Sequence, residues 1–419
     1  MKVKRWLFLF WIGLTIFSIG LILYTQITPF IEMEMWVVNL IHQLTGQVVK
    51  SQVVDLALIL IGLILIIISV RQWFMSIYRT VMPNQSRDLV DVMYEKHHLR
   101  HGSRILTIGG GTGLSSLLRG LKKYTTNTTA VVTVADDGGS SGRLRKEMGV
   151  LPPGDIRNCL VALADEENLM GDLFQFRFAD GESLEGHNFG NLFLVAMTSI
   201  TGDFDQAIKQ SSKILAIQGR VLPATLSPVT LCAIMEDGRV VEGESSITND
   251  GQKIQKVYLK PSSISPPEEV MEAIMDAELI IMGPGSLYTS VLPNLIMKGM
   301  VSAINRASAP KVYVCNVMTQ PGETDGFKAS DHLRALLDQA TGLKIDYCLV
   351  NNQDPPSELV EKYEEKNQYP VKPDLENIEK MGITPITASL ISTADLVRHN
   401  PEKLAERIVK LMEENKQKK

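Results

Sequence analysis

Two long apolar stretches near the start of the chain restrict its fold more than any other feature. Trp6–Tyr24 contains nineteen residues without a charged side chain, and Val53–Val70 contains only Asp55 near its edge. About twenty apolar residues in a helix are enough to cross the hydrocarbon core of a bilayer. A cleaved signal peptide is an alternative for the first stretch, but it lacks a clear small-residue cleavage site, and the second stretch would still hold the chain. The sequence therefore predicts a two-helix transmembrane hairpin within residues 1–75.

The charges that flank these stretches predict an orientation. Basic residues gather at the two outer ends of the hairpin: Lys2, Lys4, Arg5, Arg71, Arg79 and Arg87. The connecting segment contains Lys50 as its only Lys or Arg, together with Glu32 and Glu34. By the positive-inside rule, both termini and the main domain lie in the cytoplasm of a two-pass cell-membrane protein. No ionisable residue lies deep in either stretch, so we interpret the hairpin as an anchor and not as a transport path.

The remaining residues divide into a juxtamembrane connector at 76–103, an α/β domain at 104–410 and a frayed, lysine-rich tail at 411–419. In the domain, short apolar runs alternate with helical patterns, which predicts a Rossmann-like, mostly parallel sheet with helices on its faces. Strands are expected at 104–108, 130–135, 279–282, 312–317, 345–350 and near 384–387. Two β-rich runs around Asp237-Gly238, within 229–247, predict with 256–260 a small antiparallel insertion.

Composition narrows the classes of function. The net charge of −5 gives no support for nucleic-acid binding, which favours a basic domain. The four cysteines lie far apart, each in an apolar stretch: Cys159, Cys232, Cys315 and Cys348. We therefore expect buried free thiols, which suit a reducing compartment better than disulfides do.

A glycine-rich segment follows the first expected strand. Gly109, Gly110, Gly111, Thr112 and Gly113 precede an expected helix at 114–124. Glycine permits positive φ and a close approach of the backbone to a ligand. The start of the helix offers unpaired N–H groups and a positive dipole end, which favour a phosphate. The spacing fits neither G-x-G-x-x-G nor G-K-[ST], so a phosphate ligand is predicted, but both a dinucleotide and a Walker-type triphosphate are disfavoured.

Further polar groups follow the second expected strand, at the same edge of the sheet. Asp136 and Asp137 either bind a ribose or hold Mg²⁺ against a diphosphate, and the sequence leaves both alternatives open. Ser140 and Ser141 supply hydroxyl groups in a flexible loop, and Arg143 offers charge to phosphate oxygens.

Two more motifs precede apolar helices. Asp155 is expected to be the N-cap of one helix, with Arg157 and Asn158 in its first turn. His187, Asn188 and Asn191 surround a glycine before another helix. Their donors and acceptors suit recognition of a base or sugar, and no partner for acid–base chemistry lies nearby in the sequence.

A later strand repeats the pattern of strand, glycines and helix. Gly283, Gly285 and Ser286 follow it, with Ser286 as the expected N-cap, and Tyr288 is placed to stack on a base or sugar. Residues 319–325 add hydroxyl, amide and carboxylate groups after another strand. Near the end, Arg398 precedes a helix with Asn400 at its N-cap and Pro401 at its first position, where it can return to the cleft.

As a set and in this order, "GGGTGLS", "VTVADDGGSSGRLR", "PPGDIRN", "GHNFGNLFL", "GPGSLYTSVLPN", "VCNVMTQPGETDGF" and "RHNP" resemble the bacterial gluconeogenesis-factor family. That family is similar to the archaeal 2-phospho-L-lactate transferases, and the resemblance covers roughly residues 104–410. It implies a Rossmann-like fold, a nucleotide sugar of the UDP-N-acetylglucosamine type, and a role in gluconeogenic growth, cell shape and envelope metabolism. On this resemblance, Tyr288 and Arg398 match positions that hold the nucleotide sugar. The hairpin is a departure, because many relatives are soluble without one.

Two functions follow from these patterns. The favoured one is a membrane-anchored cytoplasmic protein that binds a UDP-sugar and regulates carbon flow into the envelope, with no residue assigned as catalytic. The alternative is a transferase in which Asp136 and Asp137 hold Mg²⁺, and Arg143, Arg145 or Arg157 stabilises a leaving phosphate. Mg²⁺ is the one candidate cofactor. The envelope-synthesis or regulatory protein partner and a homo-oligomeric state are left open, and the glycine spacing disfavours a nicotinamide dehydrogenase.

Overall fold

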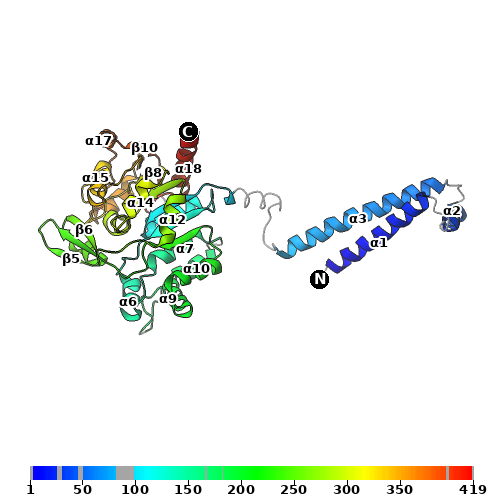
Figure 1. The fold of residues 1–419 in the computed structure, drawn as a ribbon, viewed down its shortest axis with the longest axis horizontal. Helices are drawn as coiled ribbons and strands as arrows, with labels where there is room; N and C mark the ends of the chain where they lie inside the picture. The colour runs from blue at the N-terminus through cyan, green and yellow to red at the C-terminus, as the bar shows by residue number, and fades with distance from the viewer. Residues whose placement is uncertain are drawn as a thin grey trace. The chain divides into compact units, whose positions relative to one another are not determined.

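The computed structural model describes residues 3–25, 31–45, 51–81, 99–165, 168–181, 183–392 and 396–417. The chain forms two compact units, Met1–Glu95 and Lys96–Lys419 (Figure 1). Most of the connector predicted at 76–103 lies outside the described residues. Its first part belongs to the last helix of the first unit, and Leu99 is already buried in the second unit.

The first unit contains three helices in its described residues: α1 Val3–Tyr24, α2 Ile31–Thr45 and α3 Ser51–Val81. Two segments of α1 and α3 are long and apolar enough to cross a membrane, Lys4–Tyr24 and Gln52–Ser76, with mean hydropathy of 2.3 and 3.1. Gly62 lets the two helices pack closely, since a Cβ at this position would lie 2.5 Å from the Phe17 nitrogen. Small residues bring membrane helices together in this way. The helix α2 was not expected from the sequence, and the orientation stays a prediction.

The second unit is built on one parallel sheet with strand order β10-β9-β8-β7-β1-β2-β3. Its strands are β1 Ile105–Gly109, β2 Thr128–Val132, β3 Arg220–Pro223, β7 Leu279–Met282, β8 Lys311–Val314, β9 Tyr347–Asn351 and β10 Thr384–Ala388. The predicted Rossmann-like parallel sheet is therefore confirmed, and the strand expected at 279–282 has the same bounds as the observed β7. The strand β3 was missed because it is short, lies at the edge and contains a proline.

Successive residues of the strands point into two separate cores, which explains the apolar runs in the sequence. Leu106 and Ile108 belong to the larger core, and Ile105 belongs to the smaller core on the other face. In the smaller core, Leu117 and Leu404 come from helices near the two ends of this unit. Both faces of the sheet are thus covered by helices.

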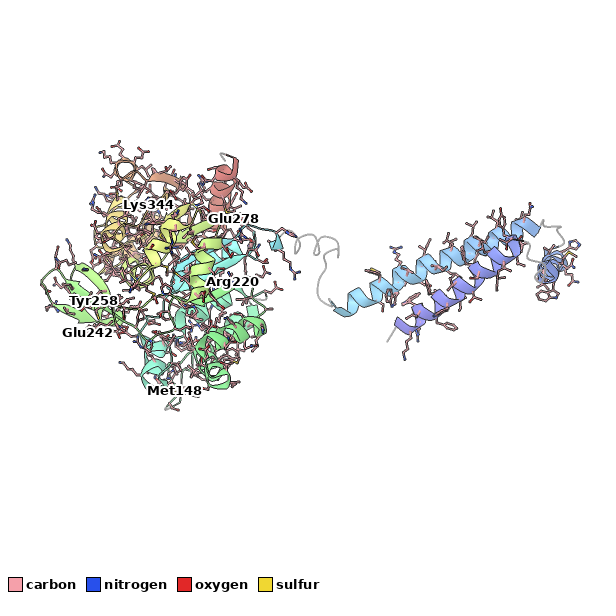
Figure 2. The ribbon with its side chains drawn as sticks, in the orientation of Figure 1. Met148, Arg220, Glu242, Tyr258, Glu278 and Lys344 are labelled. Carbon is pink, nitrogen blue, oxygen red and sulfur yellow. The ribbon has the colours of Figure 1, made fainter. Side chains whose placement is uncertain are left out.

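The predicted antiparallel insertion is also confirmed. Its strands are β4 Thr230–Met235, β5 Val240–Glu242 and β6 Ile254–Lys260, in the order β5-β4-β6. Glu242 and Tyr258, both labelled in Figure 2, pair with Cys232 from the two sides. The expected β-rich run ends early, because residues from Glu244 form the helix α11.

The described helices of the second unit are α5 Gly111–Leu121, α6 Gly139–Met148, α7 Gly154–Leu163, α8 Asn168–Gln175, α9 Phe189–Thr201, α10 Phe204–Ile214, α11 Glu244–Asp250, α12 Glu268–Asp276, η2 Leu287–Val291, α13 Leu292–Leu295, α14 Met300–Arg306, α15 Ala329–Gln339, α16 Ser357–Glu364, α17 Leu375–Lys380 and α18 Pro401–Gln417. The expected frayed tail at 411–419 needs correction. The helix α18 continues to Gln417, and Leu411 and Met412 are buried in the smaller core.

The strand order reverses between β1 and β7. The chain runs from β1 outward to β2 and β3, and from β7 outward to β8, β9 and β10. The loops after β1 and β7 therefore leave the sheet in opposite directions and open a crevice at its carboxyl edge. Ligands of open α/β sheets bind at such a switch point.

Candidate functional site

A cavity of about 700 Å³ lies at this switch point. Its walls come from the glycine loop after β1, the loops after β7 and β8, the helix α16 and the segment around β12 (Arg398–His399). Seven of the residues singled out from the sequence line it: Gly110, Gly111, Thr112, Gly113, Gly285, Ser286 and Arg398. Segments far apart in the sequence thus meet at one site, as the placement of their motifs at strand ends predicts.

The glycines of the first loop serve the packing of the protein as well as the cavity. Gly111 has φ of +66°, a conformation that favours glycine. A Cβ at Gly113 would lie 2.7 Å from the carbonyl oxygen of Pro284, and one at Gly110 would lie 2.5 Å from Asp155 Oδ2. Two glycines are therefore required because other protein groups pack against them. The expected contact between backbone N–H groups and a ligand is therefore restricted to the part of the loop that these neighbours do not cover.

The start of the helix after β7 is occupied by a carboxylate of the chain itself. Glu323 accepts hydrogen bonds from the hydroxyl of Ser286, from Thr289 Oγ1 at 3.2 Å, from the Tyr288 N–H at 3.2 Å and from Gln320 Nε2 at 3.1 Å. Burial raises the pKa of Glu323, and these donors oppose the shift. Ser286 holds the expected N-cap position, but its hydroxyl bonds to Glu323 and Thr289 and not to the helix backbone.

Tyr288 does not line the cavity. Its side chain is only 4% exposed and belongs to the larger core. Burial, with a smaller contribution from Glu323, raises the pKa of its phenol to about 12. The expected stacking of Tyr288 on a base or sugar is not favoured by this position.

The tyrosine that does line the cavity is Tyr363 on α16, which the sequence reasoning missed. Its hydroxyl accepts a hydrogen bond from the Val397 N–H at 3.2 Å, which ties α16 to the segment that carries Arg398. Lys362 lines the cavity from the same helix, and Lys366 lines it from the turn that follows this helix. Their one signal in the sequence is a pair of lysines four residues apart beside a tyrosine, without a glycine loop or a strand end to mark it.

Three carboxyl groups, Asp136, Asp137 and Asp155, lie beside the cavity and a fourth, Glu244, lines it, in an arrangement different from the one expected. The Oδ1 atom of Asp136 accepts from the Gly138 N–H at 2.8 Å, and that of Asp137 accepts from the Ser245 N–H at 2.9 Å. Two further carboxyl groups, Asp155 and Glu244, lie near enough to Asp136 to be affected by its charge. Burial and these like charges raise the pKa of Asp155 to about 7 and that of Glu244 to about 9. Within the described ranges, no three His, Cys, Asp or Glu side chains form a metal site.

Asp155 also needs correction as a helix cap. The helix α7 begins at Gly154 with Pro153 at the N-cap position, so Asp155 lies inside the first turn. Its carboxyl group accepts a hydrogen bond from the Gly111 N–H in the glycine loop. By contrast, Asn400 caps α18 as expected, since its Oδ1 accepts from the Glu402 and Lys403 N–H groups.

The other expected site residues form a polar network outside the cavity. They are Asp136, Asp137, Ser140, Ser141, Arg143, Arg157, Asn158, His187, Asn188 and Asn191. Ser140 Oγ lies 3.1 Å from His187 Nδ1, and Asn188 Oδ1 caps α9 at 3.3 Å. Arg157 donates to Asn158 Oδ1 at 2.6 Å. Gly109 ends β1, and Gly283 has φ of +78° after β7; neither lines the cavity.

Comparison with known proteins agrees with this architecture. The profile of the 2-phospho-L-lactate transferase CofD family matches residues 105–391. The gluconeogenesis factor of Bacillus subtilis is 52% identical over 312 residues, covering 74% of this chain and 98% of its own length. A crystal structure from Bacillus halodurans matches with a TM-score of 0.71 and 49% identity, covering 74% of this chain and 99% of that one.

A relative from Nostoc sp. extends the match to the N-terminal unit. It is 46% identical over 417 residues, which cover 98% of this chain and 90% of the relative. The match to that relative therefore includes the N-terminal unit, while the match to the Bacillus subtilis protein covers a smaller share of this chain. On the profile, these identities and their coverage, the chain belongs to the gluconeogenesis-factor family, whose fold is that of the 2-phospho-L-lactate transferase CofD proteins.

Proposed function

We propose that this chain binds a UDP-sugar of the UDP-N-acetylglucosamine type in the cavity at the switch point. The observation that supports the proposal is the combination in one cavity of the start of α5, the cations Lys362, Lys366 and Arg398, and the ring of Tyr363. A volume of about 700 Å³ suits a ligand of this size.

Each part of the ligand has a chemical counterpart. The start of α5 and the three cations suit the diphosphate, because helix N-termini and basic side chains both attract phosphate oxygens. Tyr363 is placed to stack on the uracil ring. Asn316 and Gln320 also line the cavity, and the Oε1 atom of Gln320 can accept from a sugar hydroxyl, whereas the Asn316 amide bonds to the backbone of Gly285.

We further propose that the protein acts as a regulator and not as a catalyst. The chain would sense the nucleotide sugar at the cytoplasmic face of the membrane, held there by α1 and α3, and adjust gluconeogenic growth, cell shape and envelope-precursor supply. A protein partner would carry this signal. The name of the Bacillus subtilis relative supports the link to gluconeogenesis.

The test is calorimetry on the full-length chain in detergent micelles, titrated with UDP-N-acetylglucosamine. Tyr363→Ala and Arg398→Ala are expected to weaken binding by about tenfold or more, the effect of one lost charge-assisted hydrogen bond or stacking contact. Tyr288→Phe and Arg334→Met serve as controls and are expected to bind as the wild type does. Retained affinity in both cavity variants, or loss in Tyr288→Phe alone, would contradict this position of the site.

A transferase is the second candidate, supported by the match to the CofD family and by the carboxylates beside the cavity. Mg²⁺ binds through one or two carboxylates together with substrate phosphates. Asp136 and Asp155 fit this role better than Asp136 and Asp137 do, because the adjacent pair bonds to separate backbone groups. Release of a nucleotide that requires Mg²⁺ and disappears in Asp136→Asn, followed by mass spectrometry, would favour this function. Intact ligand after long incubation would favour the regulator.

A further inference from the structure

A second hollow, of about 520 Å³, lies on the second unit apart from the main cavity. It is lined by Gly139, Arg143, Arg177, Glu185 and Gly186, none of which lines the main cavity. Gly139 and Arg143 come from the first two turns of α6, whose far end is Met148 in Figure 2. The motif around Arg143 thus lines a hollow that takes no part in the proposed function.

Two exposed arginines beside this hollow are each oriented by a hydrogen bond to the backbone. Arg143 Nη2 donates to the carbonyl oxygen of Glu185 at 2.7 Å, and Arg177 Nη1 donates to that of Gly186 at 2.6 Å. Neighbouring carbonyls of one short segment therefore orient both guanidinium groups. Each guanidinium has five N–H donors, so these bonds use only a part of them. No described carboxylate forms an ion pair with either arginine.

Two arginines and two acids contribute charge around the hollow, since Glu185 lines it and Glu147 acts on His187 together with Arg143 and Arg177. Burial and the charge of Arg143, with a smaller contribution from Arg177, lower the pKa of His187. Burial and the charge of Arg177 lower the pKa of Arg157 to about 10. The hollow also meets the start of α6, where Gly139 has φ of +48° and a Cβ would meet no atom within 4 Å. The first turn of this helix is therefore open to a ligand.

We propose that this hollow is a second ligand site, which binds a phosphate group between Arg143 and Arg177. Arginine binds phosphate through pairs of parallel hydrogen bonds, and two oriented guanidiniums suit such an anion better than two mobile lysines would. The phosphate belongs either to a small metabolite or to a lipid headgroup. Phe176 and Leu184 precede Arg177 and Glu185 in the sequence and are 51% and 42% exposed, so they offer apolar surface to an acyl chain.

The test uses inorganic phosphate as the probe and full-length protein in detergent micelles, measured by calorimetry. All proteins carry Arg398→Ala to weaken phosphate binding in the main cavity. The other cations of that cavity are the same in every protein, so a difference in affinity reports on the hollow whatever the fate of the proposed function. Adding Arg143→Met and Arg177→Met is expected to weaken phosphate binding by at least about tenfold. Adding Arg334→Met, which removes an exposed arginine of α15, is expected to leave it unchanged. Equal affinity in the double variant and its parent, or no binding to the parent at millimolar phosphate, would overturn the proposal.

A second pair of variants guards against damage to the loop that the arginines brace. Arg143→Lys with Arg177→Lys keeps both charges and one donor to each carbonyl, and loses only the paired geometry. An intermediate loss of affinity at an unchanged melting temperature supports the site, and wild-type affinity in this pair contradicts the paired geometry.

The source of the phosphate is distinguished with two further ligands, glycerol 3-phosphate and the short-chain lipid dihexanoyl phosphatidylglycerol. Equal affinities identify a free phosphate compound. Tighter binding of the lipid that is reduced by Phe176→Ser identifies a headgroup with its chain on the apolar surface. Binding of neither ligand by the Arg398→Ala protein would overturn the proposal.

Discussion

The loops after β1 and β7 have similar sequences but different surroundings. Each follows a buried strand, contains glycines and leads into a helix, and each has a carboxylate at that helix start. Glu323 at the second loop is held by four donors from the chain. Asp155 at the first loop accepts from Gly111 but is repelled by Asp136. The second helix start is thus neutralised by Glu323, while the first borders the cavity and bonds Asp155, whose pKa is raised by burial and by the charge of Asp136.

The difference teaches that a strand, glycines and a helix do not by themselves identify a phosphate site. A helix N-terminus attracts any anion, and an acid of the same chain satisfies it as well as a ligand does. The surroundings decide which of the two occupies it. The loop after β7 forms part of the cavity wall, and the loop after β1 places the start of the helix α5 at the cavity.

The largest effect is expected from removing the carboxylate of the second loop. Glu323→Ala removes the acceptor of the buried Tyr288 N–H and one partner of each of the Ser286 and Thr289 hydroxyls, which stay bonded to each other. The free energy of unfolding is expected to fall by roughly 4 kcal/mol, because each buried unpaired group costs about 1–3 kcal/mol. Urea unfolding measures it, with Glu323→Gln as the control that keeps an acceptor oxygen. A loss below about 1 kcal/mol would mean that this helix start is not held by Glu323.

A smaller loss is expected where the two loops touch. Gly113→Ala places a methyl group 2.7 Å from the Pro284 carbonyl oxygen, which is too close for real Cβ contacts. The backbone must shift, and we expect destabilisation of about 2–3 kcal/mol together with weaker ligand binding. Thermal unfolding and calorimetry measure both effects. Unchanged binding in a destabilised variant would show that the first loop does not contact the ligand.

The acid of the first loop predicts a dependence on pH. The pKa of Asp155 is about 7 in the folded chain and lower when unfolded, so the folded state holds the proton more tightly. The stability from this group is complete below about pH 4 and is lost as pH rises to about 7, by roughly 2 kcal/mol once partial exposure is allowed for. Asp155→Asn is expected to reduce the slope of urea unfolding free energy against pH. An unchanged slope would contradict the charge repulsion at this loop.

The smallest effect is expected at Gly111. Its φ of +66° disfavours alanine by about 1–2 kcal/mol, but a Cβ there would meet only Ser290 Oγ at 3.7 Å. Gly111→Ala is therefore expected to be milder than Gly113→Ala in thermal unfolding. The reverse order would show that the conformation of the loop matters more than its packing.

Much of the fold could be predicted from the sequence, because buried parallel strands are continuous apolar runs followed by polar or glycine-rich loops. That pattern identified β7 and the position of the glycine loop. It failed for β3, which is short and contains Pro223, and for α2, which lies between the two apolar helices. The candidate site was predicted where motifs follow strands. It was missed at α16, since a helix that closes a cavity from a distant part of the chain has no such pattern.

The same limit explains Tyr288. Its place after the second glycine loop suggested a ligand contact, but the turn η2 directs the ring into the core. The tyrosine beside Arg398 in space is Tyr363, which no local motif joins to it. Adjacency across the fold depends on packing between helices, and local sequence patterns do not encode it.

The contact between α5 and α18 has a consequence for biosynthesis. Gly120 on α5 lies against the backbone of Pro401, and Leu117 and Leu121 share a core with Leu404 and Ile408. The first helix after the glycine loop is therefore buried by a helix that the ribosome makes much later in synthesis. The apolar hairpin is complete and available to a membrane long before this happens. A truncated chain that lacks α18 would leave the apolar face of α5 exposed. A quality-control protease would then recognise the incomplete protein by this exposed surface.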